Sequence, residues 1–282
     1  MKQPRTVDKI FAGQVSIDGA GVRLQRLFGY HEASLFDPFL LLDYFGSDRP
    51  EDYRNGFPWH PHRGIETITY MIEGSCEHGD SLGNMGVIAT GDVQWMTAGS
   101  GIIHQEMPQG DEKGRMFGFQ LWANLPSTHK MMAPRYRDIK DNAIPRVRLA
   151  NGIEIRIICG TVDGVRGPAE DVVIDPEYLD VYLPAQTEFS RPLPAGHTAF
   201  IAVFKNGLRV ADAAVGQGAV ALLKQGDFLT VQALEKPARF LLVSGKPLKE
   251  PIAWRGPIVM NTQEELAAAF QAFNNGTFIQ KP

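Results

Sequence analysis

The stretch Ile65–Ile72, with the sequence IETITYMI, decides the fold class of this chain. It is rich in β-branched and aromatic residues, which suit the pleated, half-buried surface of a β-strand. Similar short runs recur between turn-forming Gly and Pro residues, at Gly86–Ile88, Val93–Met96, Met116–Trp122, Ile153–Ile158, Val172–Ile174, Ala199–Phe204, Val220–Leu223, Phe228–Val231 and Phe240–Val243. The gaps are too short for the helices of a parallel α/β sheet, so we expect an all-β sandwich or barrel.

A weak internal repeat predicts two similar β modules in tandem. In the first half a strand ends at Gly74 and another begins after Gly91-Asp92, and the same arrangement returns at Gly207 and Gly226-Asp227. Self-similarity of this kind is typical of duplicated structural units. The divide falls within residues 124–151, where Pro, Lys and Arg are frequent, and we expect this stretch to be a connector on the surface.

One helix is predicted near the end of the chain, over about residues 263–273. Thr262 and Glu265 form a capping-box pattern immediately before the apolar run Leu266–Phe270. Apolar residues at this spacing normally face a core, so we expect the helix to pack on the β-structure rather than to carry chemistry.

Composition excludes several classes of protein. The chain has 28 Lys and Arg against 32 Asp and Glu, for a formal charge of −4, and it lacks the basic stripe of a nucleic-acid-binding protein. Its two cysteines, Cys76 and Cys159, are too few and too far apart for a disulfide framework. The N-terminus lacks the apolar core of a secretory signal, and no apolar run has the length of a membrane helix. We therefore expect a cytoplasmic protein.

Two short motifs predict a metal site. On a strand, His60 and His62 are two residues apart and therefore face the same side, and His104 and Glu106 repeat that spacing. Two such pairs on neighbouring strands would surround one ion with three imidazoles and one carboxylate. These ligands suit Fe, Mn, Co, Ni, Cu or Zn.

The spacing leaves the carboxylate undecided. Glu66 lies four residues after His62 and would face the same side on an unbroken strand, so either Glu66 or Glu106 could complete the site. An isolated His-x-His also has an ordinary explanation as a pair of hydrogen-bonded histidines. The β-rich context and the Gly99-Ser100-Gly101 turn before the second pair favour the metal site.

Longer motifs resemble the pirin family over nearly the whole chain. In order, they are Leu35–Phe45 (LFDPFLLLDYF), Phe57–Tyr70 (FPWHPHRGIETITY), His78–Gly83 (HGDSLG), Gly91–Pro108 (GDVQWMTAGSGIIHQEMP), Gly118–Pro126 (GFQLWANLP), Glu250-Pro251 and Gly256–Glu265 (GPIVMNTQEE). The resemblance implies a bicupin, with two antiparallel cupin barrels in tandem and a C-terminal helix. Residues 1–130 would form the metal-binding barrel, and residues 131–282 a barrel that has lost its ligands.

The resemblance also implies a ligand set and a metal. It assigns His60, His62, His104 and Glu106 to one divalent transition metal, expected to be Fe(II), with Mn, Ni, Co, Cu or Zn as alternatives. It thus favours Glu106 over Glu66, which would be a neighbour of the site. His197 is the one histidine near the corresponding part of the second barrel, and we expect it to be a surface or hydrogen-bonded residue because a lone histidine cannot hold a metal.

The resemblance implies two kinds of role. One role known in the family is a dioxygenase that opens the central ring of flavonols such as quercetin, with Glu106 taking the substrate proton. Another is a metal-dependent regulator that binds a protein partner, and a third reading makes the metal a structural staple of the barrel. We expect a small-molecule flavonol substrate, no direct binding to nucleic acid, no membrane association, and a monomer.

Three residues near the motifs carry smaller expectations. Trp59 stands where the family has a smaller residue, and its indole is expected to narrow or line the mouth of the pocket. His78 and Asp80 match the family in the excursion between the two motifs, where a role in stabilising a turn is at least as well supported as a functional one.

Overall fold

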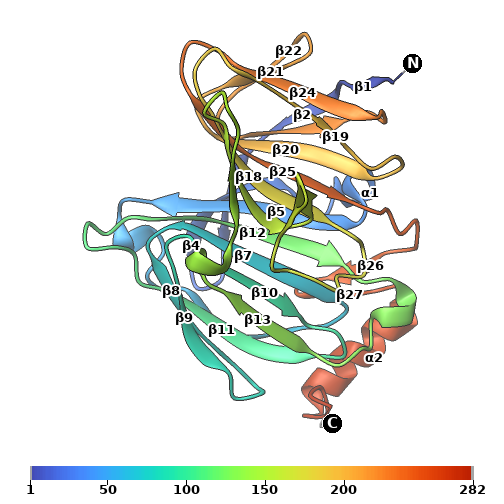
Figure 1. Cartoon of the computed structure of the whole chain (residues 1–282). Helices are drawn as coiled ribbons and strands as arrows, with labels where there is room; N and C mark the ends of the chain where they lie inside the picture. Colours follow the sequence, from blue (N-terminus) through green and yellow to red (C-terminus); the bar gives the residue numbers. More distant parts are fainter. Residues whose placement is uncertain (1, 281–282) are drawn as a thin grey trace. The chain divides into compact units, whose positions relative to one another are not determined.

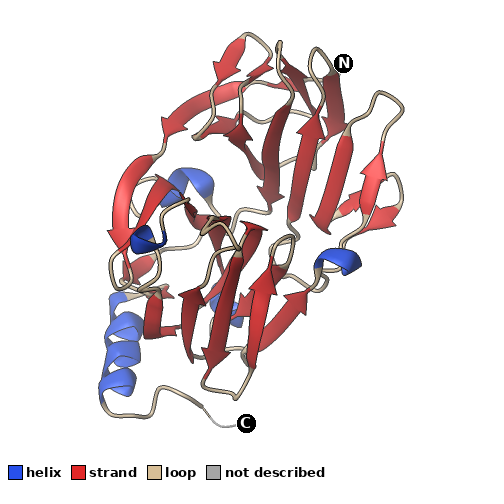
Figure 2. Ribbon diagram, turned by 90° about the vertical axis from the view of Figure 1, so that its left-hand side faces the viewer, coloured by secondary structure: helices blue, strands red, loops and turns tan. Residues whose placement is uncertain are grey.

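The computed structural model describes residues 2–280, which form two compact units. We call them the first and second barrel. The first barrel comprises Val15–His31, Phe39–Asp141 and Leu248–Pro282, and the second comprises Met1–Gln14, Glu32–Pro38 and Asn142–Pro247. Figure 2 shows many strands and few helices, so the all-β prediction is confirmed.

The first barrel is built from two antiparallel sheets (Figure 1). The larger contains β3 (Gln14–Asp18), β4 (Val22–Phe28), β5 (Phe39–Ser47), β7 (Ile65–Glu73), β10 (Val93–Thr97), β12 (Met116–Asn124) and β13 (Arg135–Ile139), in the order β13-β10-β7-β12-β5-β4-β3. The smaller contains β6 (Phe57–His62), β8 (Ser75–Asp80), β9 (Met85–Ala89) and β11 (Ile102–Pro108), in the order β6-β11-β8-β9. Buried residues alternate with half-buried ones along β11, so one face of that strand is directed to the interior.

The second barrel also has two large sheets, beside the two-stranded β16-β17 (Thr161–Val162 and Val165–Arg166). One has the order β14-β15-β18-β25-β20-β23-β2, from β2 (Val7–Ala12), β14 (Arg146–Arg148), β15 (Glu154–Cys159), β18 (Glu177–Leu183), β20 (Thr198–Lys205), β23 (Ala219–Leu223) and β25 (Ala238–Gly245). The other contains β1 (Pro4–Arg5), β19 (Glu188–Pro192), β21 (Leu208–Val210), β22 (Ala213–Val215) and β24 (Phe228–Ala233). Their shared interior is filled by aliphatic and aromatic side chains, among them Ile155, Leu179, Ile201 and Phe240.

Each barrel contains a segment from the opposite end of the chain. The division predicted at residues 130 and 131 places the N-terminal strands in the first barrel and the C-terminal helix in the second. In the structure, β2 pairs with β23, so the first residues belong to the second barrel. The segment Leu248–Pro282 belongs to the first. It contains β26 (Ala253–Arg255), β27 (Ile258–Met260) and α2 (Gln263–Asn274).

The predicted C-terminal helix is confirmed as α2. Glu265 N–H donates to Thr262 Oγ1 at 3.1 Å, and Thr262 N–H donates to Glu265 Oε2 at 3.1 Å, which completes the capping box. Leu266 and Ala269 are buried on its inner face. Neither α-helix among residues 2–280 has the length and apolar character needed to cross a membrane.

Two local expectations are wrong. Val172–Ile174 is a turn rather than a strand, because Asp171 and Asp175 on either side have positive φ angles, which end extended structure. The stretch between the modules is not merely a surface connector, because it supplies β13, which pairs with β10 in the first barrel. The remaining short elements are α1 (Ala33–Phe36), β16 (Thr161–Val162), β17 (Val165–Arg166) and the 3-10 turns Pro50–Asp52, Ser127–His129 and Asp141–Ala143.

Candidate metal centre

Strands β6 and β11 bring the three predicted histidines together. The strands pair antiparallel, with His60 opposite His104 and Ile102 opposite His62. His60 and His62 face the same side of β6 because successive side chains on a strand alternate. The ring centroids of His60 and His104 lie 4.4 Å apart, and that of His62 lies 4.9 and 5.0 Å from these two.

The ring nitrogens converge on one point. One nitrogen from each of the three histidines lies within 4.8 Å of the others, and His60 Nε2 is 3.1 Å from His62 Nε2. His60 Nδ1 lies 2.8 Å from the carbonyl oxygen of Pro58, and His62 Nδ1 lies 3.0 Å from that of Pro257. A carbonyl can only accept, so each Nδ1 carries the proton and each Nε2 presents a lone pair to the common point.

The donor set fits a transition-metal ion. Burial lowers the pKa of His62 and of His104 well below the usual value, so both rings are neutral, as ligation requires. His104 Nε2 is buried and has no hydrogen-bond partner among the described residues. A buried, unpaired imidazole nitrogen beside two others is costly unless an ion satisfies it. The carbonyl contacts of His60 and His62 are the outer partners that orient metal-binding imidazoles.

Glu106 lies beside this group. Its carboxylate is buried, and its Oε1 accepts a hydrogen bond from the Thr69 hydroxyl at 3.1 Å. Burial raises the pKa of Glu106, and the neighbouring His60 works in the opposite direction. The convergent group within 4.8 Å contains the three histidines without Glu106, so its role as the fourth ligand stays a prediction.

Glu66 occupies a different environment. The unbroken strand that would bring it to the site is absent, because β6 ends at His62 and β7 begins at Ile65 in the other sheet. Gly64, with a φ of +78°, makes the break. Glu66 Oε1 accepts a hydrogen bond from the Thr97 hydroxyl at 2.6 Å.

A cavity of about 580 Å³ opens beside the histidines. His60, His62 and Glu106 line it, and Thr69 and Met71 line it from β7. Glu66 lies three residues before Thr69 and five before Met71 on β7, so its side chain faces the other side of this strand. The rest of the wall is largely apolar and includes Tyr30, Leu41, Phe45, Trp122 and Trp254.

The aromatic wall was missed by sequence reasoning. Trp122 meets the His62 ring edge-on, with centroids 5.0 Å apart, and Trp254 lies 5.9 Å from Trp122 and 5.4 Å from Tyr30. Trp254 is held by a 2.7 Å hydrogen bond from its indole N–H to the carbonyl of Gly256. It comes from the C-terminal segment, almost two hundred residues after His60 and His62, and no local motif marks it.

The prediction that Trp59 narrows or lines the mouth of the pocket is wrong. It alternates with His60 along β6, is 55% exposed, and is not part of the cavity wall. Its neighbour Phe57 lines the cavity instead.

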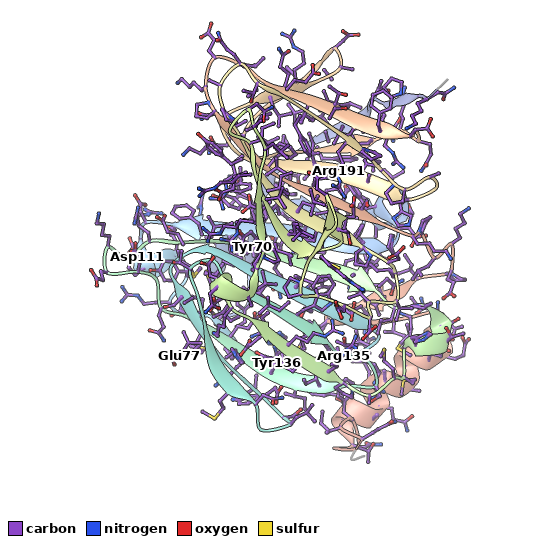
Figure 3. The ribbon with its side chains drawn as sticks, viewed as in Figure 1. Tyr70, Glu77, Asp111, Arg135, Tyr136 and Arg191 are labelled. Carbon is purple, nitrogen blue, oxygen red and sulfur yellow. The ribbon has the colours of Figure 1, made fainter. Side chains whose placement is uncertain are left out.

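The other residues near the motifs have mainly structural contacts. Asp80 Oδ1 accepts from the backbone N–H groups of Leu82 and Asn84, as in a stabilised turn. His78 is buried, and its Nε2 lies 2.8 Å from the hydroxyl of Tyr136, which Figure 3 labels. In the second barrel His197 is buried rather than at the surface, and its Nδ1 has no hydrogen-bond partner among residues 2–280.

The fold and the site together define a bicupin whose first barrel carries a three-histidine centre of the metal-binding type. The pirin family matches residues 21–123, and the pirin C-terminal cupin domain matches residues 178–279. The chain belongs to the pirin family, as its motifs indicated. Proteins of this family typically bind one metal ion, with which the three histidines are compatible.

Similar proteins extend over nearly the full length of the chain. A pirin-like protein of Caulobacter vibrioides is 47% identical, over 97% of this chain and 99% of its own. Human pirin is 39% identical, over 92% of this chain and 88% of its own. The crystal structure of a quercetin 2,3-dioxygenase from Acinetobacter baumannii has a TM-score of 0.90 and 34% identity, with 98% of each chain covered.

Proposed function

We propose that this protein is a metal-dependent dioxygenase that cleaves flavonols such as quercetin with O₂. The observation that carries the proposal is the placement of His60 and His62 on the wall of a largely apolar cavity of about 580 Å³. That volume lies within the range of small-molecule sites, and the aromatic wall suits a flat aromatic substrate. The similar Acinetobacter protein, named as a quercetin 2,3-dioxygenase, supports the same reading.

The three histidines would hold the metal, with Glu106 as the fourth ligand and Fe(II) as the expected ion. A bound metal of this kind polarises a substrate oxygen and brings substrate and O₂ together. The chain itself provides the orientation. The carbonyls of Pro58 and Pro257 fix the rings of His60 and His62, so that both Nε2 atoms face the cavity.

Glu106 would act as the base that takes the proton of the flavonol hydroxyl. Burial raises its pKa, which makes the carboxylate a better proton acceptor than one in water. The Thr69 hydroxyl shares its one proton between Glu106 Oε1 at 3.1 Å and Gln120 Oε1 at 2.5 Å, and so lies between the carboxylate and Gln120. The apolar side chains around it exclude water from the reacting groups.

The test is an aerobic quercetin assay with metal analysis of the same sample. We expect one O₂ to be consumed and one CO released for each quercetin cleaved. His60→Ala should lose both metal and turnover, and Glu106→Gln should lose turnover. Glu66→Gln is the matched control, because Glu66 is also a buried carboxylate of the same barrel but lies off the cavity wall. A folded, metal-loaded protein with no turnover on several flavonols would contradict the proposal.

A further inference from the structure

An ion pair between the buried Asp43 and the half-buried Arg26 interrupts the largely apolar wall of the cavity. Asp43 on β5 is 5% exposed, and Arg26 on β4 clasps it with two hydrogen bonds, from Nε to Oδ1 at 2.9 Å and from Nη2 to Oδ2 at 2.8 Å. Both residues line the cavity. Arg26 Nη2 also donates to Asp18 at 3.0 Å, so the guanidinium is anchored from two sides.

The Asp43 carboxylate has capacity left to bind a ligand. A carboxylate offers about four lone-pair positions, and Arg26 uses one on each oxygen. The two hydrogen bonds from Arg26 fix the plane of the Asp43 carboxylate, so a ligand hydroxyl would meet an acceptor that is already oriented. Because the surroundings are apolar, a charge-assisted hydrogen bond formed there is stronger than one in water.

The sheet register sets how far Asp43 lies from the metal centre. Asp43 is directly opposite Gln120 on β12, and Gln120 is directly opposite Thr69 on β7. Adjacent strands are about 4.8 Å apart, so the backbones of Asp43 and Thr69 are separated by about 10 Å. Thr69 in turn bonds to Glu106. A flat molecule of two or three fused or linked rings can therefore reach from the centre to Asp43.

We propose that Asp43, held by Arg26, is a specificity-determining residue that accepts a hydrogen bond from a phenolic hydroxyl at the end of the substrate remote from the metal. This inference rests on the proposed function and sharpens it. The cavity selects flavonols that carry a hydroxyl on a distal ring over the parent 3-hydroxyflavone, which has none. Gln120 borders the same position and supplies a second polar contact.

The charge state of Asp43 agrees with this role at neutral pH. Burial raises its pKa to about 6, while Arg26 opposes that rise. The groups that face it are Arg26 from β4, Asp18 from β3 and Gln120 from β12. At pH 7 and above the carboxylate is therefore mainly ionised and can accept.

The experiment compares two ligands on three proteins. Affinity for quercetin and for 3-hydroxyflavone is measured by absorbance titration of the metal-loaded protein without O₂, and kcat/KM is measured with O₂. Asp43→Asn should lower quercetin affinity roughly ten- to a hundredfold, the loss of one hydrogen bond to a charged group, and change 3-hydroxyflavone by much less. Asp92→Asn is the control, because Asp92 is a buried carboxylate paired with Lys140 at 2.9 Å, away from the cavity wall.

A ligand-side comparison keeps the test decisive if Asp43→Asn does not fold. Quercetin derivatives in which single distal hydroxyls are methylated lose the donor, and one of them should bind wild-type protein as weakly as 3-hydroxyflavone does.

Each outcome separates the two proposals. Turnover of both flavonols with an unchanged preference in Asp43→Asn would overturn the role of Asp43 and leave the dioxygenase intact. Selective binding without turnover would overturn the dioxygenase and support the role of Asp43. If neither flavonol binds the metal-loaded protein, both are wrong.

Discussion

The buried Lys130 fixes the two backbone segments that orient His62, and its replacement tests this role. Its side chain is 1% exposed, and Nζ donates to the carbonyl of Gly64 at 2.9 Å, to Asn124 Oδ1 at 2.7 Å and to the carbonyl of Val259 at 2.9 Å. Gly64 is two residues after His62, one of the three convergent histidines. Val259 is two residues after Pro257, whose carbonyl accepts from His62. One ammonium thus fixes both segments that orient this imidazole.

Replacing Lys130 by Met keeps most of the stem and removes the donors. Three hydrogen bonds from a charged donor are together worth about 4.5–9 kcal/mol. Burial offsets part of this gain, and the same desolvation lowers the pKa of Lys130 to about 7. We expect a net loss of about 3 kcal/mol in the free energy of unfolding, as three buried acceptors are left unpaired. For a unit of this size the melting temperature should fall by about 6–12 °C.

The assay is thermal unfolding followed by circular dichroism, with metal content measured on the same preparations. Lys140→Met is the matched control, since the Lys140 side chain is 51% exposed and its ion pair with Asp92 contributes about 1 kcal/mol or less. The Lys130 variant should also retain less metal than wild type. Equal melting temperatures for the two variants would refute the reasoning.

Three further predictions concern the cavity. Because burial raises the pKa of Asp43 from 3.8 to about 6, the native state holds this proton more tightly than the unfolded chain. The contribution of Asp43 to the free energy of unfolding is therefore complete below about pH 4 and is lost as the pH rises through about 6. Urea unfolding measured across this pH range should show the loss in wild type and not in Asp43→Asn. Thr69→Val removes the hydroxyl that holds Glu106 and should lower both stability, by about 1–3 kcal/mol, and kcat in the quercetin assay. Trp254→Ala should raise KM several-fold through lost aromatic contact, with kcat little changed in steady-state kinetics.

Strand periodicity predicted that the histidines of the two motifs lie close together, and the structure shows that they do. The two-residue spacings at His60 and His104 brought three imidazoles together because both pairs lie on regular, neighbouring strands. The same periodicity failed for Glu66, since it assumes a continuous strand. Gly64 ends that continuity, and a positive φ angle at a glycine cannot be read from hydrophobic alternation.

The parts that sequence reasoning missed depend on long-range pairing. Trp254 and Pro257 contribute to the centre from the far end of the chain, where neither is recognisable as a site residue. The connector was taken for surface because it is charged, yet Lys130 is buried there with all its hydrogen-bonding capacity used. Tertiary contacts overrode local composition in both cases.

The exchange of terminal segments has a consequence for synthesis on the ribosome. A chain grows from its N-terminus, and a domain normally folds as soon as its last residue emerges. Here the carbonyl that orients His62 belongs to Pro257, and β2 has to wait for β23. Neither barrel can finish folding before most of the chain has been made, so the two halves cannot be produced as independent fragments cut at the middle. The three-histidine group reaches its final arrangement only after Pro257 has been made, about two hundred residues after His62.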